Sequence, residues 1–332
     1  MATDPVAAGD AVGRRLAGRR RWRDGRSADR LWAGVTAAAG VALVALFAGL
    51  VGSLTVGALP ALRAFGAGFA FSEAWNPVTE EFGALASLAG TVVTSLLALA
   101  LAVPVAFGIA VFLSELCPAA LRRPLGIAIE LLAAIPSIVY GMWGLFVFAP
   151  FLAEHVQPPM TRLIGGLPLV GRLFDGPPIG IGVFTAGLIL AVMVLPLIAA
   201  VMRDALEATP PLLAESAYAL GATTWEVVWK VAVPHARAGL FGAVVLGLGR
   251  ALGETMAVTF VIGNAHRLNA SLFLPGSTIS STLANEFAEA TGELHTASLV
   301  ALGWILFILT ALVISLSRIL LRRLARRDGA RA

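Results

Sequence analysis

Long apolar runs separated by short polar segments dominate this chain. Each run reaches or exceeds about 20 residues, the length at which a helix crosses the hydrocarbon core of a bilayer. Prolines inside these runs are tolerated in membrane helices, because neighbouring helices satisfy the backbone groups that a proline frees. The pattern predicts six membrane-spanning helices, at about residues 31–59, 84–113, 124–152, 179–203, 236–264 and 296–321.

The composition agrees with a membrane protein. Hydrophobic residues make up 58% of the 332 residues and charged residues only 13%, which is about half of their share in soluble domains. The first apolar run follows an arginine-rich segment, residues 1–30, and is longer than the apolar region of a signal peptide, about 7–15 residues. We therefore expect an all-α polytopic membrane protein that keeps its first helix.

The basic residues predict the orientation of the chain. Loops that face the cytoplasm carry an excess of lysine and arginine. With the N-terminus inside, the cytoplasmic segments and their flanks hold nineteen basic residues, and the external segments hold four. We expect both termini in the cytoplasm, together with the loops at 114–123 and 203–235.

Several chemistries are excluded or receive no support. The single cysteine rules out an intrachain disulfide, and the four histidines lack the spacing of metal ligands. The single lysine does not follow a glycine, so the chain has no GxxxxGK[ST] phosphate-binding loop and does not bind ATP in that way. These residues are Cys117, His155, His235, His266, His295 and Lys230.

The longest cytoplasmic segment, 203–235, reads as two short helices. Its signals are an N-cap with a following proline, a glycine that ends the first helix, a capping box and a terminating proline. Thr209 is the N-cap and Pro210 the proline that follows it, and Gly221 is the glycine that ends the first helix. Thr223 and Glu226 form the capping box, and Pro234 is the terminating proline. A helix–glycine–helix hairpin is therefore predicted at the membrane surface.

This segment resembles the EAA loop of ABC importer permeases. Glu215, Ala217, Gly221 and Pro234 match its spacing, with Ser216 in place of the middle alanine. In that family the loop forms the coupling helix, which sits in a groove of the nucleotide-binding subunit.

We expect Trp225, Val228 and Trp229 to be exposed on this hairpin, as the surface that transmits movement. A plain amphipathic helix at the membrane interface is the alternative, because tryptophan concentrates there too.

Further stretches resemble the PstC-type permease subunits of bacterial phosphate importers. They include FSEAWNP, VPVAFGIAVFLSE, ELLAAIPSIVYGMWGLFVFAP and GRALGETMAV, and the resemblance covers about residues 65–320. It implies a type I importer permease in the bacterial plasma membrane, with an N-terminal helix wrapped around a five-helix core. It also implies three kinds of partner: a homologous PstA-type permease, a PstB-type ATP-binding subunit dimer and an external PstS-type phosphate-binding protein.

ATP and Mg²⁺ would bind to the ATPase partner, so this chain would bind no cofactor and would not be an enzyme. Its parts would be the tail 1–30, the first helix with an external segment at 31–83, the core 84–321 and the tail 322–332.

Two opposite charges, Arg250 and Glu254, interrupt the fifth apolar run four residues apart. An arginine in mid-bilayer costs at least about 2.5–3.5 kcal/mol, and its planar fork suits phosphate oxygens. Phosphate that sheds its water shell needs such donors, and Glu254 one helical turn away would neutralise the arginine when no anion is bound. We expect the pair to belong to the substrate pathway. A static ion pair that locks the helices together is the alternative.

Pro136, Ser137 and Tyr140 are candidate pore-lining residues, because a proline frees a carbonyl and the following Gly141 lets backbones approach. Packing alone explains them equally well. We expect Glu130 to lie at the cytoplasmic interface.

Two other functions remain open on the sequence. The first is a permease of the same fold for another oxyanion, such as sulfate or molybdate. The second is a secondary carrier that needs no ATPase, although this interpretation leaves the EAA spacing unexplained.

Overall fold

The computed structural model describes residues 25–168 and 170–329. The chain forms two compact units, Met1–Ser53 and Leu54–Ala332. The described part of the first unit is the beginning of helix α2 (Gly25–Phe65). Its side chains from 29 to 50 are all exposed, and they are mostly apolar, as expected of a helix surrounded by lipid.

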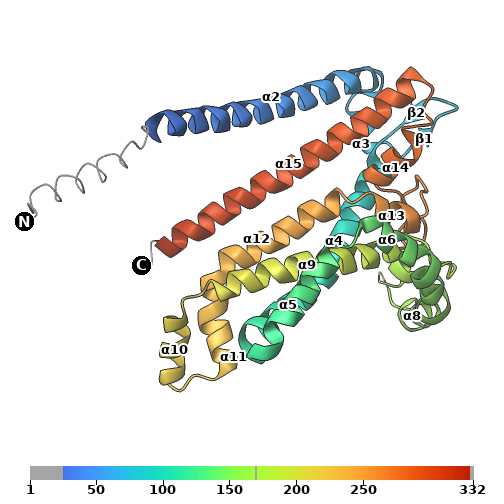
Figure 1. Ribbon diagram of the computed structural model, residues 1–332. Helices are drawn as coiled ribbons and strands as arrows, with labels where there is room; N and C mark the ends of the chain where they lie inside the picture. Colours follow the sequence, from blue (N-terminus) through green and yellow to red (C-terminus); the bar gives the residue numbers. More distant parts are fainter. Residues whose placement is uncertain (1–24, 169, 330–332) are drawn as a thin grey trace, which may run out of the picture. The chain divides into compact units, whose positions relative to one another are not determined.

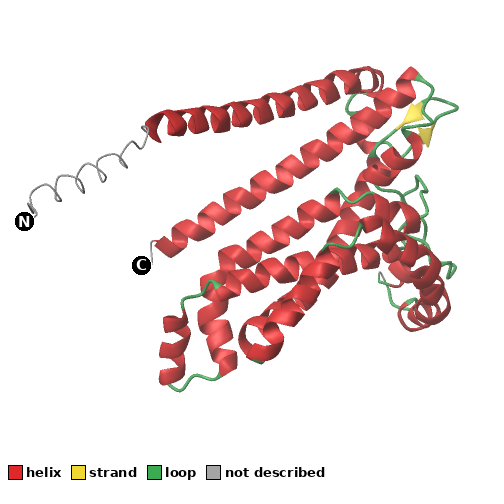
Figure 2. Cartoon of the chain, viewed as in Figure 1, coloured by secondary structure: helices red, strands yellow, loops and turns green. Residues whose placement is uncertain are grey.

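Six helices in the described part of the chain are long and apolar enough to cross a membrane. They are Asp29–Phe65, Leu85–Leu116, Ser137–Ile164, Val183–Glu207, Thr224–Leu252 and Glu293–Leu321. The predicted number is confirmed, and the bounds of the second and fourth spans lie within four residues of the prediction, as does the start of the sixth. Figures 1 and 2 show how strongly helix dominates the chain.

The third span was predicted wrongly at 124–152. Helix α5 (Ala119–Ala133) ends before Pro136, and α6 (Ser137–Trp143) begins after it. A proline removes a backbone donor and restricts the residue before it, so the break falls there. The span then continues as one helical path through η2 (Gly144–Phe148), α7 (Ala149–Phe151), η3 (Leu152–Val156) and α8 (Gln157–Ile164).

The fifth span also differs from the predicted 236–264. It begins at α11 (Thr224–Val227), passes through the π-helical turn η5 (Val228–Ala232) and continues as α12 (Val233–Leu252). The chain then breaks and resumes as α13 (Met256–Val261).

Pro234 was predicted to end the second hairpin helix, and this prediction is wrong, because the helix continues through Pro234. This proline lies at the junction of η5 and α12, just after the π-helical turn.

Close packing of small residues forms the core of the second unit. Helix α4 (Leu85–Val111) packs along α9 (Val183–Glu207), and α12 packs on α9 as well. Four alanines of α4 are fully buried along one face: Ala98, Ala102, Ala106 and Ala110. This four-residue spacing lets the backbones of membrane helices approach closely.

A second cluster of buried residues joins both ends of the second unit's sequence. It contains Phe69, Phe82, Ile279, Leu299 and Leu302. They come from α3 (Gly68–Phe71), β2 (Glu81–Phe82), α14 (Ile279–Glu286) and α15 (Glu293–Gly329). Strand β2 pairs antiparallel with β1 (Trp75–Asn76), a small addition to the predicted all-helical fold (Figure 2).

Three short helices complete the described elements, and one of them, the π-helical turn η1 (Phe112–Leu116), extends α4. The 3₁₀ turn η4 (Gly171–Phe174) follows α8, and α10 (Pro211–Ala219) precedes α11 in the 203–235 loop.

Candidate functional site

An open cavity of about 760 Å³ lies between α12 and α15. Among the described residues that line it, the charged ones are Arg250, Glu254 and Arg318. A Cβ on Gly242 or Gly249 would meet no neighbouring atom within 4 Å, so the space beside this part of α12 is open. The structure thus places Arg250 and Glu254 on one cavity, and adds Arg318, which the sequence indicated only as a basic flank of the last span.

A break in the helix separates the two predicted pathway charges. Arg250 lies in the last turn of α12, which ends at Leu252, whereas Glu254 lies in the break before α13. The expected spacing of one turn along a continuous helix is therefore wrong. Among the described residues, no hydrogen bond or ion pair joins the two side chains.

Each charge matches the helix end next to it. The C-terminal end of a helix carries a partial negative charge and favours a cation such as Arg250. Glu254 is only 9% exposed, and its Oε1 accepts a hydrogen bond of 3.3 Å from the Ala257 N–H in the first turn of α13. The carboxylate is thus held by the backbone, while the Arg250 side chain is exposed to the cavity.

Helix α6 packs directly against α13, the helix that follows this break. A Cβ on Gly141 would lie 2.9 Å from the Ala257 Cα and 2.8 Å from Phe260 Cδ2, so only glycine fits. The stretches IPSIVYG and GRALGETMAV, more than a hundred residues apart, are therefore brought together.

The candidate pore-lining residues lie beside the cavity rather than on it. Pro136 is the exposed N-cap of α6, and Ser137 begins that helix. The Tyr140 hydroxyl donates a hydrogen bond of 2.9 Å to the Leu132 carbonyl, across the proline break. None of the three is among the described residues that line the 760 Å³ cavity.

An ion pair connects α5 to α9. Arg203 Nη2 lies 3.0 Å from the Glu130 carboxylate and 2.8 Å from that of Asp204. The Arg203 side chain is largely buried and the Glu130 side chain is half-exposed.

The hairpin of α10 and α11 has the predicted turn and the predicted capping box. Gly221 adopts φ +85°, the left-handed conformation expected of a glycine that ends a helix. Thr223 and Glu226 exchange both hydrogen bonds of the capping box.

The predicted cap at Thr209 is wrong. Pro210 occupies the N-cap position, and Pro211 opens α10. Thr209 is one residue too early, and among the described residues its buried hydroxyl has no hydrogen-bond partner.

The hairpin presents an aromatic surface. Trp225 is 70% exposed and Trp229 44% exposed, with their rings 5.3 Å apart in an edge-to-face arrangement. Glu215 is exposed on α10, and Ala217 is half-buried on the same helix. Val228 was predicted to be exposed and is buried, as are its neighbours Val227 and Ala232.

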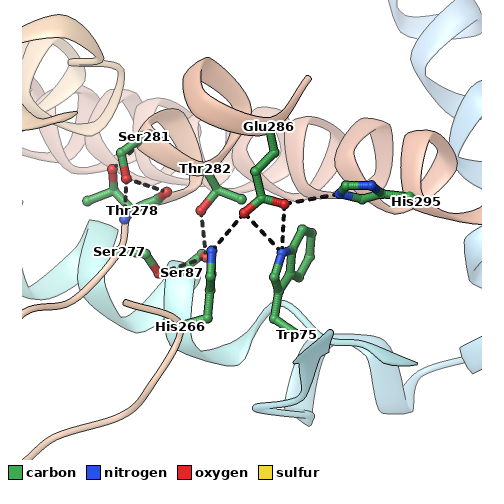
Figure 3. A network of polar contacts seen from close by, with 9 residues as sticks. All are labelled: Trp75, Ser87, His266, Ser277, Thr278, Ser281, Thr282, Glu286 and His295. Carbon is green, nitrogen blue, oxygen red and sulfur yellow. Dashed lines mark hydrogen bonds and ion pairs between the residues drawn. The ribbon is translucent and has the colours of Figure 1, made fainter. Parts of the chain in front are cut away.

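Sequence reasoning missed a cluster around Glu286, shown in Figure 3. His266 Nε2 and His295 Nε2 donate to its carboxylate over 2.9 and 3.0 Å, and the Trp75 indole N–H donates over 2.9 Å. The two histidines that seemed scattered thus share one carboxylate. No short spacing reveals this, because Trp75 is 211 residues from Glu286.

The pKa of the Glu286 carboxyl lies below its usual value. Desolvation raises this pKa, but the hydrogen bonds from His266, Trp75 and His295, together with the charge of His266, lower it by more. The carboxylate is therefore ionised, and it ties β1, the 264–278 loop, α14 and α15 together.

Known proteins resemble nearly the whole chain. The family described as binding-protein-dependent transport system inner membrane component matches residues 102–327. A phosphate transport system permease protein PstC from Mesorhizobium japonicum is 55% identical over 302 residues, which cover 91% of this chain and 92% of that protein. The PstC 2 protein of Mycobacterium tuberculosis is 41% identical over 300 residues, with coverage of 89% and 92%.

Solved structures share the fold. A bacterial ABC transporter involved in import of the acidic polysaccharide alginate aligns with a TM-score of 0.56 at 17% identity, covering 92% of this chain and 99% of that one. The bacterial alginate transporter in complex with an alginate pentasaccharide-bound periplasmic protein gives 0.57 at 16% identity, with coverage of 92% and 98%. The chain is thus a multi-pass membrane protein that belongs to the binding-protein-dependent transport system inner membrane components and, within them, to the PstC permease proteins.

Proposed function

We propose that this chain is the permease subunit of an ATP-driven importer of inorganic phosphate and forms half of its translocation pathway. The observation that carries the proposal is the 55% identity to a phosphate permease over 91% of the chain. The chemistry of the cavity supports it, because an arginine with no ion-pair partner among the described residues is a ready site for an oxyanion.

Arg250 and Glu254 have different tasks in this proposal. Arg250 offers its fork to the phosphate oxygens from the end of α12. Glu254 is anchored to the α13 backbone by its bond to Ala257, so it lowers the net positive charge of the site without occupying the guanidinium. Phosphate binding is then transient, as transport requires. Pro136, Ser137 and Tyr140 support the break from the side of α6 and form no part of the phosphate site itself.

The α10–α11 hairpin is the contact with the ATPase. Glu215, Ala217, Gly221 and Pro234 carry the coupling motif, and Trp225 is the exposed anchor. The excess of basic residues in the hairpin loop and near both termini supports a cytoplasmic location for them. ATP and Mg²⁺ bind to the PstB-type partner, so this chain needs no cofactor.

The remaining assembly follows from the same family. The core 84–321 pairs with a homologous PstA-type permease, and a PstS-type protein delivers phosphate from outside. Residues 31–83 supply the first helix and an external segment, and 1–30 and 322–332 are cytoplasmic tails.

Uptake by the reconstituted complex tests the phosphate site. Arg250→Gln in an assembled complex is expected to lower phosphate uptake at least about tenfold, the loss that follows from removing one charge-assisted hydrogen bond. Arg250→Lys keeps the positive charge but lacks the planar fork, so its phosphate uptake should lie between that of the wild type and that of Arg250→Gln. Arg63→Gln is the matched control, because Arg63 is an exposed arginine in the last turn of α2.

Three outcomes would contradict the proposal. Wild-type uptake by an assembled Arg250→Gln complex would exclude Arg250 from the pathway. Equal competition by sulfate would favour another oxyanion as substrate. Uptake without the ATPase subunit would favour a secondary carrier.

A further inference from the structure

Arg318 of α15 faces the same cavity as Arg250. The α15 residues that line it are Ile314, Ser317, Arg318 and Leu321, whose spacing of three and four residues is that of one helical face. The α12 residues that line it follow the same spacing, from Gly242 to Arg250. The two arginine-bearing faces therefore border one space.

The charges in this cavity do not balance. Arg250, Glu254 and Arg318 are the charged side chains among its described lining residues, which leaves one excess positive charge on a mostly apolar surface. Glu254 is engaged with the α13 backbone. Arg318 makes no hydrogen bond or ion pair with any described residue, so its guanidinium is available to an anion.

The position of Arg318 distinguishes it from an ordinary basic flank. It lies on the cavity wall, four residues after Ile314 and three before Leu321, which line the cavity too, within a helix that continues to Gly329. The positive-inside rule accounts for arginines beyond a span but does not require one on a cavity wall. Helix α15 runs antiparallel to α12 and ends on the side of the α10–α11 hairpin (Figure 1).

We propose that Arg318 is a second oxyanion-binding group of the pathway, which takes phosphate between Arg250 and the cytoplasm. The proposal rests on the proposed function and its orientation. Two arginines in sequence let the anion exchange one set of donors for another, so neither site has to hold it tightly. A single strong site would trap the ion.

Phosphate uptake by the assembled complex tests this role. Arg318→Gln is expected to lower uptake at least about tenfold, with partial recovery in Arg318→Lys. Arg237→Gln is the control, because Arg237 is a basic residue at the start of α12 that does not line the cavity. The same comparison in vesicles made only of zwitterionic lipid distinguishes the two anion sources. If Arg318 binds phosphate, Arg318→Gln should still lower uptake there. If Arg318 binds anionic lipid headgroups, wild type and Arg318→Gln should have the same uptake there.

Thiol labelling provides a readout that does not depend on turnover. Cys117, the single cysteine, is buried, so a Leu246→Cys variant places one reactive thiol on the cavity wall. Inorganic phosphate should slow labelling of this thiol with Arg318 present and should protect it several-fold less in Arg318→Gln.

The outcomes separate the two proposals. If the wild-type complex imports no phosphate, the proposed function fails. Suppose that the wild type imports phosphate and Arg250→Gln does not. If Arg318→Gln then takes up as much phosphate as Arg237→Gln, and the protection of the thiol by phosphate is undiminished, only the role of Arg318 is overturned. If Arg318→Gln fails to assemble, labelling in the Arg318→Lys background decides, and unchanged protection there together with wild-type uptake overturns the role.

Discussion

A partly buried carboxylate is stable only where its oxygens are paired, and Glu286 meets this condition with donors from three separate segments. Figure 3 shows the two imidazoles and the indole directed at one carboxylate, beside a row of hydroxyl contacts that includes Ser87 with Ser277 and Thr282. The Trp75 ring also stacks on the His266 ring, with 5.2 Å between the ring centroids. Loss of the carboxylate would leave several donors without an acceptor.

We expect Glu286→Gln to lower the free energy of unfolding by about 1–3 kcal/mol, because hydrogen bonds to a charged group are lost. Thermal unfolding of the purified protein measures this. Glu154→Gln is the matched control, because the Glu154–His155 pair is 3.9 Å apart and both side chains are exposed. A control that loses as much stability would show that the geometry around Glu286 has no special role.

The lowered pKa of Glu286 also gives this contribution a pH dependence. The folded pKa lies below the ordinary 4.5, so the contribution is complete above about pH 4.5 and is lost as the pH falls through the folded value. The stability difference between wild type and Glu286→Gln should therefore shrink on acidification. A difference that grows in acid would contradict the assigned sign.

Single residues differ in how well the sequence reveals them. Arg250 and Glu254 stand out because charges are costly inside an apolar run. Arg318 does not stand out, because near the end of a span it looks like any topology-setting arginine. The partners of Glu286 leave no pattern at all, since only the tertiary fold brings them together.

At the scale of elements, the contact of α6 with α13 holds the broken span in place. Gly141 is buried against the Ala257 backbone, and Ala257 also donates to Glu254. The position of the carboxylate thus depends on how closely these two short helices approach.

Gly141→Ala is expected to destabilise the protein by about 1–3 kcal/mol through overpacking and to reduce phosphate uptake. Gly108→Ala is the control, because Gly108 is exposed on α4 and a Cβ there meets nothing within 4 Å. That change should be neutral or should stabilise the helix by up to about 1 kcal/mol. Thermal unfolding and uptake of both variants would test the contact, and equal behaviour would refute it.

The sequence predicts the number of membrane helices well and their interruptions poorly. The spans can be found from the length of each apolar run, because the thickness of the bilayer sets how many apolar residues a spanning helix needs. A helix breaks at Pro136, whereas the helical path continues through Pro234. A proline can therefore end one helix and be accommodated in another. A π-helical turn before Pro234 makes the difference, and no local signal in the sequence announces that turn.

At the scale of the whole molecule, the exposed tryptophan of the hairpin is the expected anchor for the ATPase. Trp225→Ala should weaken binding of the ATPase subunit by about thirtyfold or more, as is usual for a central aromatic residue of an interface. Titration of that subunit onto the purified permease pair measures this.

The stability of Trp225→Ala should not change, because the side chain is 70% exposed. Leu163→Ala is the control, because Leu163 is 79% exposed on α8 and lies outside the hairpin. Unchanged ATPase affinity in Trp225→Ala would place the contact elsewhere on the chain.

The continuous helical path from Thr224 to Leu252 has a mechanical consequence. Its 29 residues form a rod about 43 Å long at about 1.5 Å per residue. Trp225 lies near one end and Arg250 near the other, so a tilt of the rod about one end would displace the other end. A tilt of about 5° would displace the far end by about 4 Å, more than the length of a charge-assisted hydrogen bond, about 2.8 Å. A small rocking of the ATPase subunits would then be enough to make or break every contact at Arg250, and the timing of anion release would follow the nucleotide cycle without a chain of intermediate switches.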